Sequence, residues 1–181
     1  MKKNKVGILI TGLSGSGKTT IAEKISIDIQ HYFKIDCDVI DGDLIRKKYP
    51  VVLGFSKEDR FLNIKNISNL AKDSLTKGKI PICATIAPYI EMRNILRTSI
   101  QSTATFVMVY LKTPIEVCES RDVKGLYKKA RKGKIKNFTG ISDIYEIPLN
   151  PQLTFDTSIH EISFISNKII EFITNVTYYN D

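Results

Sequence analysis

The chain has 181 residues, 43 % of them hydrophobic and 25 % charged, and a formal net charge of +8. This is the composition of a soluble globular protein, and the length is sufficient for one sizeable core. No stretch approaches the ~20 apolar residues of a membrane span, and the three scattered cysteines fit neither a disulfide framework nor a CxxC metal site. We therefore expect a single domain over residues 1–181, in a reducing cytoplasm, with no membrane partner.

Strand and helix patterns alternate along the chain. Strands are expected at 6–10, 37–40, 80–85, 105–111 and 153–155. Helices are expected at 18–33, through Arg46 and Lys47, from the N-cap Ser56 to about Lys77, from Pro88 to about Ile100, from Pro114 through Ser120, and at 162–176. This order predicts an α/β fold with a parallel β-sheet flanked by helices, and ligands at the carboxyl ends of the strands.

The segment Gly12–Thr19 matches the phosphate-binding loop (P-loop, Walker A) pattern G-x-x-x-x-G-K-[ST], between the first strand and the first helix. Glycines let consecutive backbone N–H groups face one anion, and the N-terminal end of the helix favours negative charge. Lys18 can reach the β- and γ-phosphates, and the Thr19 hydroxyl can ligate Mg²⁺. We expect ATP to be held by Gly12, Leu13, Ser14, Gly15, Ser16, Gly17, Lys18, Thr19 and Thr20.

Two carboxylates, Asp41 and Asp43, follow the second predicted strand. Such a pair can hold the water shell of Mg²⁺ and take a proton from an attacking hydroxyl. The alternative is an Asp-Gly turn whose aspartate caps the next helix. The P-loop favours the catalytic interpretation, because phosphoryl transfer needs a carboxylate near the triphosphate.

The positive charge is concentrated between Arg121 and Lys136, which contain eight basic residues and one acidic residue, Asp122. A surface helix or a nucleic-acid patch are possible interpretations of such a segment. Nucleic-acid sites usually interleave aromatic residues for stacking, and only Tyr127 and Phe138 occur here. We therefore expect a small polyanionic partner and no nucleic acid.

Longer motifs extend well beyond the P-loop. They are GLSGSGKTT, DGDLIR at 41–46, LGFSKEDRFLNIKNI at 53–67, IAPY at 86–89, and the run from TPIEVC to TFDT at 113–157. In these motifs the chain resembles the adenylylsulfate (APS) kinase family over nearly its whole length. The resemblance implies a P-loop NTPase fold and transfer of the γ-phosphate of ATP to the 3′-hydroxyl of APS, giving PAPS, the activated sulfate donor. It also implies a homodimer.

The resemblance also implies the residues of the acceptor site. Phe55 and Phe138 correspond to the aromatic pair that sandwiches the APS adenine, and stacking on a base stabilises binding by roughly 1–3 kcal/mol per aromatic. Phe138 has Lys136 and Asn137 as neighbours, which disfavours a place in the core. The residues that correspond to holders of the phosphosulfate and ribose are Arg46, Arg60 and Asn63.

The basic segment, at about 121–140, resembles the family's mobile lid, which closes over both nucleotides and excludes water. Arg121 is expected to pack on the ATP adenine, and Lys124 to lie near the phosphates. Asp43 is the expected base, and Asp41 the expected support for Mg²⁺.

One motif departs from the family. The family's Ile-Ser-Pro carries a serine that has been assigned as a phosphorylated intermediate, whereas this chain has Ile86-Ala87-Pro88. Alanine has no hydroxyl, so a phosphoserine route is impossible here, and direct in-line transfer needs no protein nucleophile. Since this loop lies beside the substrate in the family, Ile86 and Ala87 are expected to contact the acceptor.

Two other functions remain as alternatives. A kinase of this fold could phosphorylate a related nucleotide 3′-hydroxyl, such as that of cytidine diphosphoramidate in capsule-sugar modification. A nucleotide-dependent switch is suggested by the D-x-x-G match at 122–125, but the chain has no N-K-x-D guanine-recognition motif.

Overall fold

The computed structural model describes residues 5–48 and 53–178. Five parallel strands form one sheet in the order β2-β3-β1-β4-β5. Their bounds are β1 Val6–Gly12, β2 Cys37–Asp41, β3 Ile80–Ala84, β4 Thr105–Leu111 and β5 Leu153–Phe155. The predicted α/β fold with a parallel sheet is confirmed, because every pair of neighbouring strands runs in the same direction.

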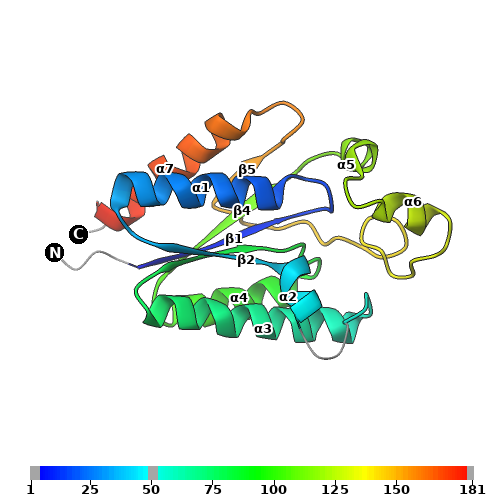
Figure 1. The fold of residues 1–181 in the computed structure, drawn as a ribbon, viewed down its shortest axis with the longest axis horizontal. Coiled ribbons are helices and arrows are strands. Elements are labelled where there is room, and N and C mark those ends of the chain that lie inside the picture. Colours follow the sequence, from blue (N-terminus) through cyan, green and yellow to red (C-terminus); the bar gives the residue numbers. More distant parts are fainter. Residues whose placement is uncertain (1–4, 49–52, 179–181) are drawn as a thin grey trace.

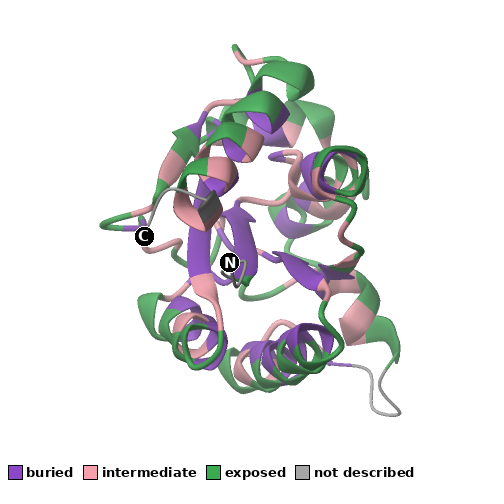
Figure 2. Ribbon diagram, turned by 90° about the vertical axis from the view of Figure 1, so that its left-hand side faces the viewer, coloured by how far each residue is buried: buried purple, intermediate pink, exposed green. Residues whose placement is uncertain are grey.

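Helices cover both faces of this sheet (Figure 1). Their bounds are α1 Lys18–Phe33, α2 Gly42–Lys48, α3 Lys57–Thr76, α4 Ile90–Gln101, α5 Ile115–Arg121, α6 Leu126–Arg131 and α7 Ile162–Tyr178. One core cluster packs α1 and α7 against the sheet, and a second packs α3 and α4 against the opposite face. Figure 2 shows the buried strands between these two layers. Burial on both faces explains why β1 and β4 are nearly continuous apolar runs.

Of the helix starts predicted from local signals, that of α3 is confirmed and that of α4 is wrong. Ser56 caps α3 as predicted, and its hydroxyl accepts a hydrogen bond from the Asp59 amide at 3.1 Å. Pro88 does not lie in the first turn of α4, because that helix begins at Ile90 with Tyr89 as its N-cap. The Pro88 carbonyl instead accepts a hydrogen bond from the Glu146 amide, so this segment pairs with a distant loop. Helix α6 lies in the basic segment, for which a surface helix was only an alternative interpretation.

Parallel strands bring their carboxyl ends to one edge of the sheet. The loop after β1, helix α2 after β2, the Ile86–Pro88 segment after β3, and α5 and α6 after β4 all lie there (Figure 1). None of the helices in the described ranges is long and apolar enough to cross a membrane.

Candidate active site

The P-loop turns tightly between β1 and α1. Gly15 and Gly17 have φ values of 78° and 89°, in the region that favours glycine. A Cβ at Gly15 would lie 2.7 Å from the carbonyl oxygen of Cys118, so the loop also packs closely on α5. The loop therefore places the N-terminal end of α1 at the carboxyl edge of the sheet, where an anion is stabilised.

The Lys18 side chain folds back over this loop. Its ammonium donates hydrogen bonds to the carbonyls of Gly12, at 3.0 Å, and Leu13, at 2.6 Å. Burial lowers the pKa of Lys18 to about 8, although the charge of Asp43 favours the protonated form. A phosphate group would supply the negative charge that this buried ammonium lacks.

Thr19 and Asp41, the two predicted metal ligands, are in direct contact. The Thr19 hydroxyl donates to one carboxylate oxygen of Asp41 at 2.6 Å. The other oxygen accepts hydrogen bonds from the amides of Asp43, at 2.8 Å, and Leu44, at 3.1 Å, so Asp41 also caps α2. The catalytic and the helix-capping interpretations of the Asp-Gly segment are therefore compatible. One oxygen of the Asp41 carboxylate contacts Thr19, and the other caps α2. A hydroxyl beside a carboxylate fits the oxygen ligands that Mg²⁺ requires.

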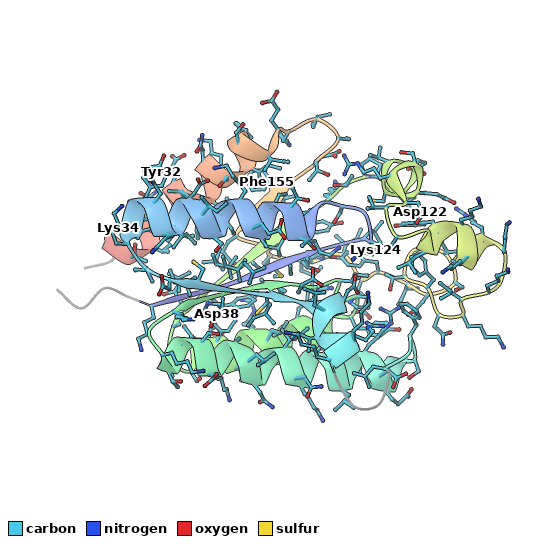
Figure 3. The ribbon with its side chains drawn as sticks, viewed as in Figure 1. Tyr32, Lys34, Asp38, Asp122, Lys124 and Phe155 are labelled. Carbon is cyan, nitrogen blue, oxygen red and sulfur yellow. The ribbon has the colours of Figure 1, made fainter. Side chains whose placement is uncertain are left out.

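Asp43 faces the basic segment. Its carboxylate accepts a hydrogen bond from the Lys124 ammonium, 81 positions away in the chain. Burial alone would raise the pKa of Asp43, but the hydrogen bond and charge of Lys124, with Lys18 and Arg46, lower that pKa below its ordinary value. Asp43 is thus an ionised carboxylate surrounded by cations. Figure 3 labels Lys124 near this edge of the sheet.

The three predicted acceptor residues on α2 and α3 point to the same region. Arg60 is 3 % exposed and donates from Nε to the Phe55 carbonyl, at 3.1 Å, and from Nη2 to the Asn137 carbonyl, at 2.7 Å. Arg46 donates to the Gly54 carbonyl at 2.6 Å. Asn63 donates to the Gly42 carbonyl at 3.0 Å, while its own side-chain oxygen is buried with no hydrogen-bond partner among the described residues. That oxygen can accept a hydrogen bond from a ligand hydroxyl.

The two predicted stacking residues lie together, but their rings are not parallel. The centroids of Phe55 and Phe138 are 6.3 Å apart and the ring planes meet at 68°. Phe138 is only 2 % exposed and packs against Tyr127, so the expectation that its polar neighbours keep it out of the core is wrong. The backbone of Asn137, just before Phe138, is in the left-handed region with a φ of 55°, a local turn that the sequence pattern did not indicate.

Arg121 joins the P-loop to the segment after β5. Its guanidinium donates to the Gly15 carbonyl, at 3.2 Å, and to the carbonyl and hydroxyl of Thr157, both at 2.8 Å. The Thr157 hydroxyl in turn lies 3.1 Å from the Ser16 carbonyl and donates to it. Sequence reasoning missed Thr157, although its place just after β5 put it at the same edge of the sheet.

The Ile86–Pro88 segment is held by a buried arginine that the sequence did not single out. Arg93 donates to the carbonyls of Ala87, at 2.8 Å, Pro88, at 3.2 Å, and Glu146, at 2.7 Å. Ala87 has a φ of 40°, which is strained for a residue with a Cβ. Arg93 therefore offsets local backbone strain and fixes this segment at the edge of the site.

These elements enclose a cavity of about 400 Å³. The predicted residues that line it are Ser14, Gly15, Gly17, Lys18, Thr19, Thr20, Asp41, Asp43, Arg46, Arg60, Asn63, Ile86, Ala87, Arg121 and Lys124. Gly12, Leu13, Ser16, Phe55 and Phe138 lie outside its lining. Residues not predicted that line it include Thr85, Met92, Tyr127, Thr157, His160 and Ile162. The P-loop, the two aspartates and the acceptor arginines therefore share one space.

A parallel sheet with a P-loop after β1 and a carboxylate pair at the end of β2 defines a P-loop phosphotransferase. The adenylylsulphate kinase family model matches residues 4–156. The chain belongs to this family, as the sequence motifs indicated.

Individual relatives match over nearly the full length. An adenylyl-sulfate kinase from Gloeothece citriformis is 42 % identical over 178 residues, which are 98 % of this chain and 99 % of the relative. The structure of the Mycobacterium tuberculosis APS kinase CysC in complex with AMPPNP and APS has a TM-score of 0.88 at 34 % identity, covering 94 % of this chain and 98 % of that chain. A hexameric APS kinase from Thiobacillus denitrificans has a TM-score of 0.72 at 25 % identity, covering 98 % of this chain and 30 % of that chain.

Proposed function

We propose that the protein is an adenylyl-sulfate kinase, which transfers the γ-phosphate of ATP to the 3′-hydroxyl of APS and gives PAPS. The observation that carries this proposal is one cavity that combines a P-loop, the ionised Asp43 and the buried Arg60, in a chain similar to adenylyl-sulfate kinases over its full length.

The P-loop and Lys18 are the proposed donor site, and Arg121 is the proposed contact of the ATP adenine. Thr19 and Asp41 are the proposed residues for Mg²⁺, since their oxygens are in contact at 2.6 Å and belong to the ligand type that this ion prefers. When bound, Mg²⁺ supplies positive charge that offsets charge on the triphosphate.

Asp43 is the proposed general base. The acceptor 3′-oxygen attacks the γ-phosphorus, its bond to phosphorus forms while the bond from phosphorus to the β,γ-bridging oxygen breaks, and ADP leaves. The hydroxyl proton passes to the Asp43 carboxylate. Lys18 and Lys124, both beside Asp43, offset the charge on the transferring group.

Arg46, Arg60 and Asn63 are the proposed contacts of the phosphosulfate and ribose, beside Ile86 and Ala87. Phe55 and Phe138 are the proposed stacking pair for the adenine. A base between them needs roughly parallel faces at about 3.5 Å on each side. Since the rings meet at 68°, APS binding must reorient at least one of them.

Transfer is proposed to be direct. Ala87 is 2 % exposed and carries no nucleophile. Its backbone, held by Arg93, shapes the acceptor side of the cavity without a covalent role. A homodimer and a mobile lid at 121–140 are further proposals from the family resemblance. A reducing cytoplasm fits the free thiols of Cys37, Cys83 and Cys118.

An acceptor panel tests the proposal. Purified protein with ATP and Mg²⁺ is given one of three acceptors: APS, cytidine diphosphoramidate, or an adenosine diphosphate analogue other than APS. ADP release is followed in each case. The proposal expects kcat/KM for APS to exceed the others by at least about 100-fold, since buried polar groups of the site are left unpaired by an ill-fitting acceptor. Faster turnover of the cytidine nucleotide would favour the alternative kinase function instead.

A further inference from the structure

A small third core cluster connects the P-loop to the basic segment. Its buried members are Cys118, Tyr127, Ala130 and Phe138, and Leu13 from the P-loop packs against them. This cluster lies beyond the carboxyl edge of the sheet and is separate from the two main cores. Packed interiors transmit displacement because they contain few voids.

Tyr127 is the member of this cluster that contacts both the P-loop and Phe138. It is 1 % exposed, and its hydroxyl donates to the carbonyl of Ser14, in the P-loop, at 3.0 Å. Its ring meets Phe138 edge to face, with centroids 5.0 Å apart and planes at 79°. Its own amide donates to the Asp122 carboxylate at 3.0 Å, which fixes the start of α6. Tyr127 therefore has a fixed place between donor loop and acceptor aromatic ring.

The contacts continue from Phe138 to the acceptor side. Phe138 meets Phe55 edge to face, and the guanidinium carbons of Arg46 and Arg60 lie 4.9 Å and 5.6 Å from the centre of the Phe55 ring. Arg60 also donates to the carbonyl of Asn137, beside Phe138. An unbroken series of contacts thus joins Ser14 to the arginines proposed to hold the acceptor.

We propose that Tyr127 is a positioning residue that couples the two nucleotide sites: when a triphosphate fixes the P-loop, the Tyr127–Ser14 hydrogen bond fixes the ring of Tyr127, which orders Phe138 for acceptor binding. The inference rests on the proposed function, because it assumes a donor at the P-loop and an acceptor at Phe138. A tyrosine that only fills the core also needs a partner for its buried hydroxyl, so the coupling role is distinguished by whether the response of the acceptor segment depends on the bond to Ser14. Removal of the Tyr127 hydroxyl therefore separates a role in core packing from a role in coupling.

Hydrogen exchange with and without AMPPNP and Mg²⁺ tests the coupling, because it needs no turnover. The peptides compared cover the P-loop, 12–19, and the Phe138 segment, 137–143. In the wild type, AMPPNP should slow exchange in both peptides. In Tyr127→Phe, which keeps the ring, the P-loop should still be protected, while the response of 137–143 should fall at least about fivefold. Tyr145→Phe is the matched control, since its hydroxyl bonds to Thr11 and not to the P-loop, and it should keep both responses.

The possible outcomes separate the two proposals. Equal responses of 137–143 in wild type and Tyr127→Phe, or no response of 137–143 in the wild type, would overturn the coupling and leave the kinase proposal standing. Failure of AMPPNP to protect 12–19 in the wild type would overturn the donor site and the coupling together. A steady-state measurement adds a second readout: at saturating ATP, Tyr127→Phe should raise KM for APS at least about fivefold while kcat changes less than about twofold. An unchanged KM would count against the coupling.

Discussion

The Lys124 ammonium and the Asp43 carboxylate form an ion pair across the candidate active site, and both side chains line the same cavity. The pair links the segment between α5 and α6 to the first residues of α2. Each charge is therefore partly offset by the other. Under the proposed function, a phosphate that enters the cavity would compete for Lys124 and leave Asp43 available to accept a proton.

The substitution Asp43→Asn tests the role of the carboxylate. It preserves the shape of the side chain and an oxygen for Lys124, but removes the proton acceptor. We expect kcat to fall by about 10²–10⁴-fold, with small changes in KM for both nucleotides. Asp73→Asn is a suitable control, because Asp73 is an exposed aspartate on α3 that pairs with Lys77 outside the cavity. Steady-state kinetics that show full activity for Asp43→Asn would exclude Asp43 as the base.

The lowered pKa of Lys18 predicts a pH dependence. Below about pH 8 the ammonium is charged and attracts the triphosphate, and above this pH it becomes neutral. Since kcat/KM for ATP reports the free enzyme, it should fall above about pH 8, approaching a tenfold decrease per pH unit. Bound phosphates favour the charged form, so kcat at saturating ATP should stay flat to a higher pH. A kcat/KM that stays constant up to pH 10 would contradict this account.

Two substitutions at Asp41 separate metal support from helix capping. Asp41→Ala removes both, and loss of the α2 cap should cost about 1 kcal/mol of unfolding free energy. Asp41→Asn keeps an oxygen for the amides of Asp43 and Leu44, so its stability should stay within about 0.5 kcal/mol of wild type. Both variants should need at least about tenfold more Mg²⁺ for half-maximal activity, because the charged ligand is lost. Thermal unfolding and Mg²⁺ titration provide the two readouts, and an unchanged Mg²⁺ requirement in Asp41→Asn would remove Asp41 from the metal site.

Direct transfer predicts that no phosphorylated protein forms. When turnover of γ-labelled ATP is stopped with acid, all of the label should be found in nucleotide and none on the protein, since Ala87 carries no hydroxyl. In addition, Ala87→Ser should change kcat by less than about threefold, because in-line transfer needs no protein nucleophile. Acid-stable label on the wild-type protein during turnover would contradict direct transfer and require another nucleophile.

The part of the site that the sequence predicts is encoded by local rules. The P-loop, together with the strand before it and the helix after it, lies within Val6–Phe33. The residues that form this unit are close together in the sequence. Asp41 was placed beside Thr19 by the rule that parallel strands end at one edge of the sheet. Local patterning and one topological rule therefore suffice for the P-loop and Asp41, but not for Thr157, whose hydroxyl donates to the Ser16 carbonyl.

The rest of the site depends on contacts between segments that are distant in the sequence, and hydrophobic patterning does not specify such contacts. Phe138 is buried in one cluster with Tyr127 of α6 and Cys118 of α5, although its sequence neighbours are polar. Arg93 resembles an ordinary helix-surface residue, yet its guanidinium is buried by carbonyls from two loops. A Tyr or Arg in a sequence gives no sign of a backbone partner dozens of residues away.

Phosphorylation of the 3′-hydroxyl of APS by this chain is tested by identifying the product. Protein with ATP and Mg²⁺ is incubated with APS or with 3′-deoxy-APS, and the products are identified by ³¹P NMR. We expect a new 3′-phosphomonoester and stoichiometric ADP with APS, and neither product with the deoxy acceptor. Absence of a 3′-phosphorylated product from APS, with a P-loop that binds AMPPNP normally, would contradict the proposed function.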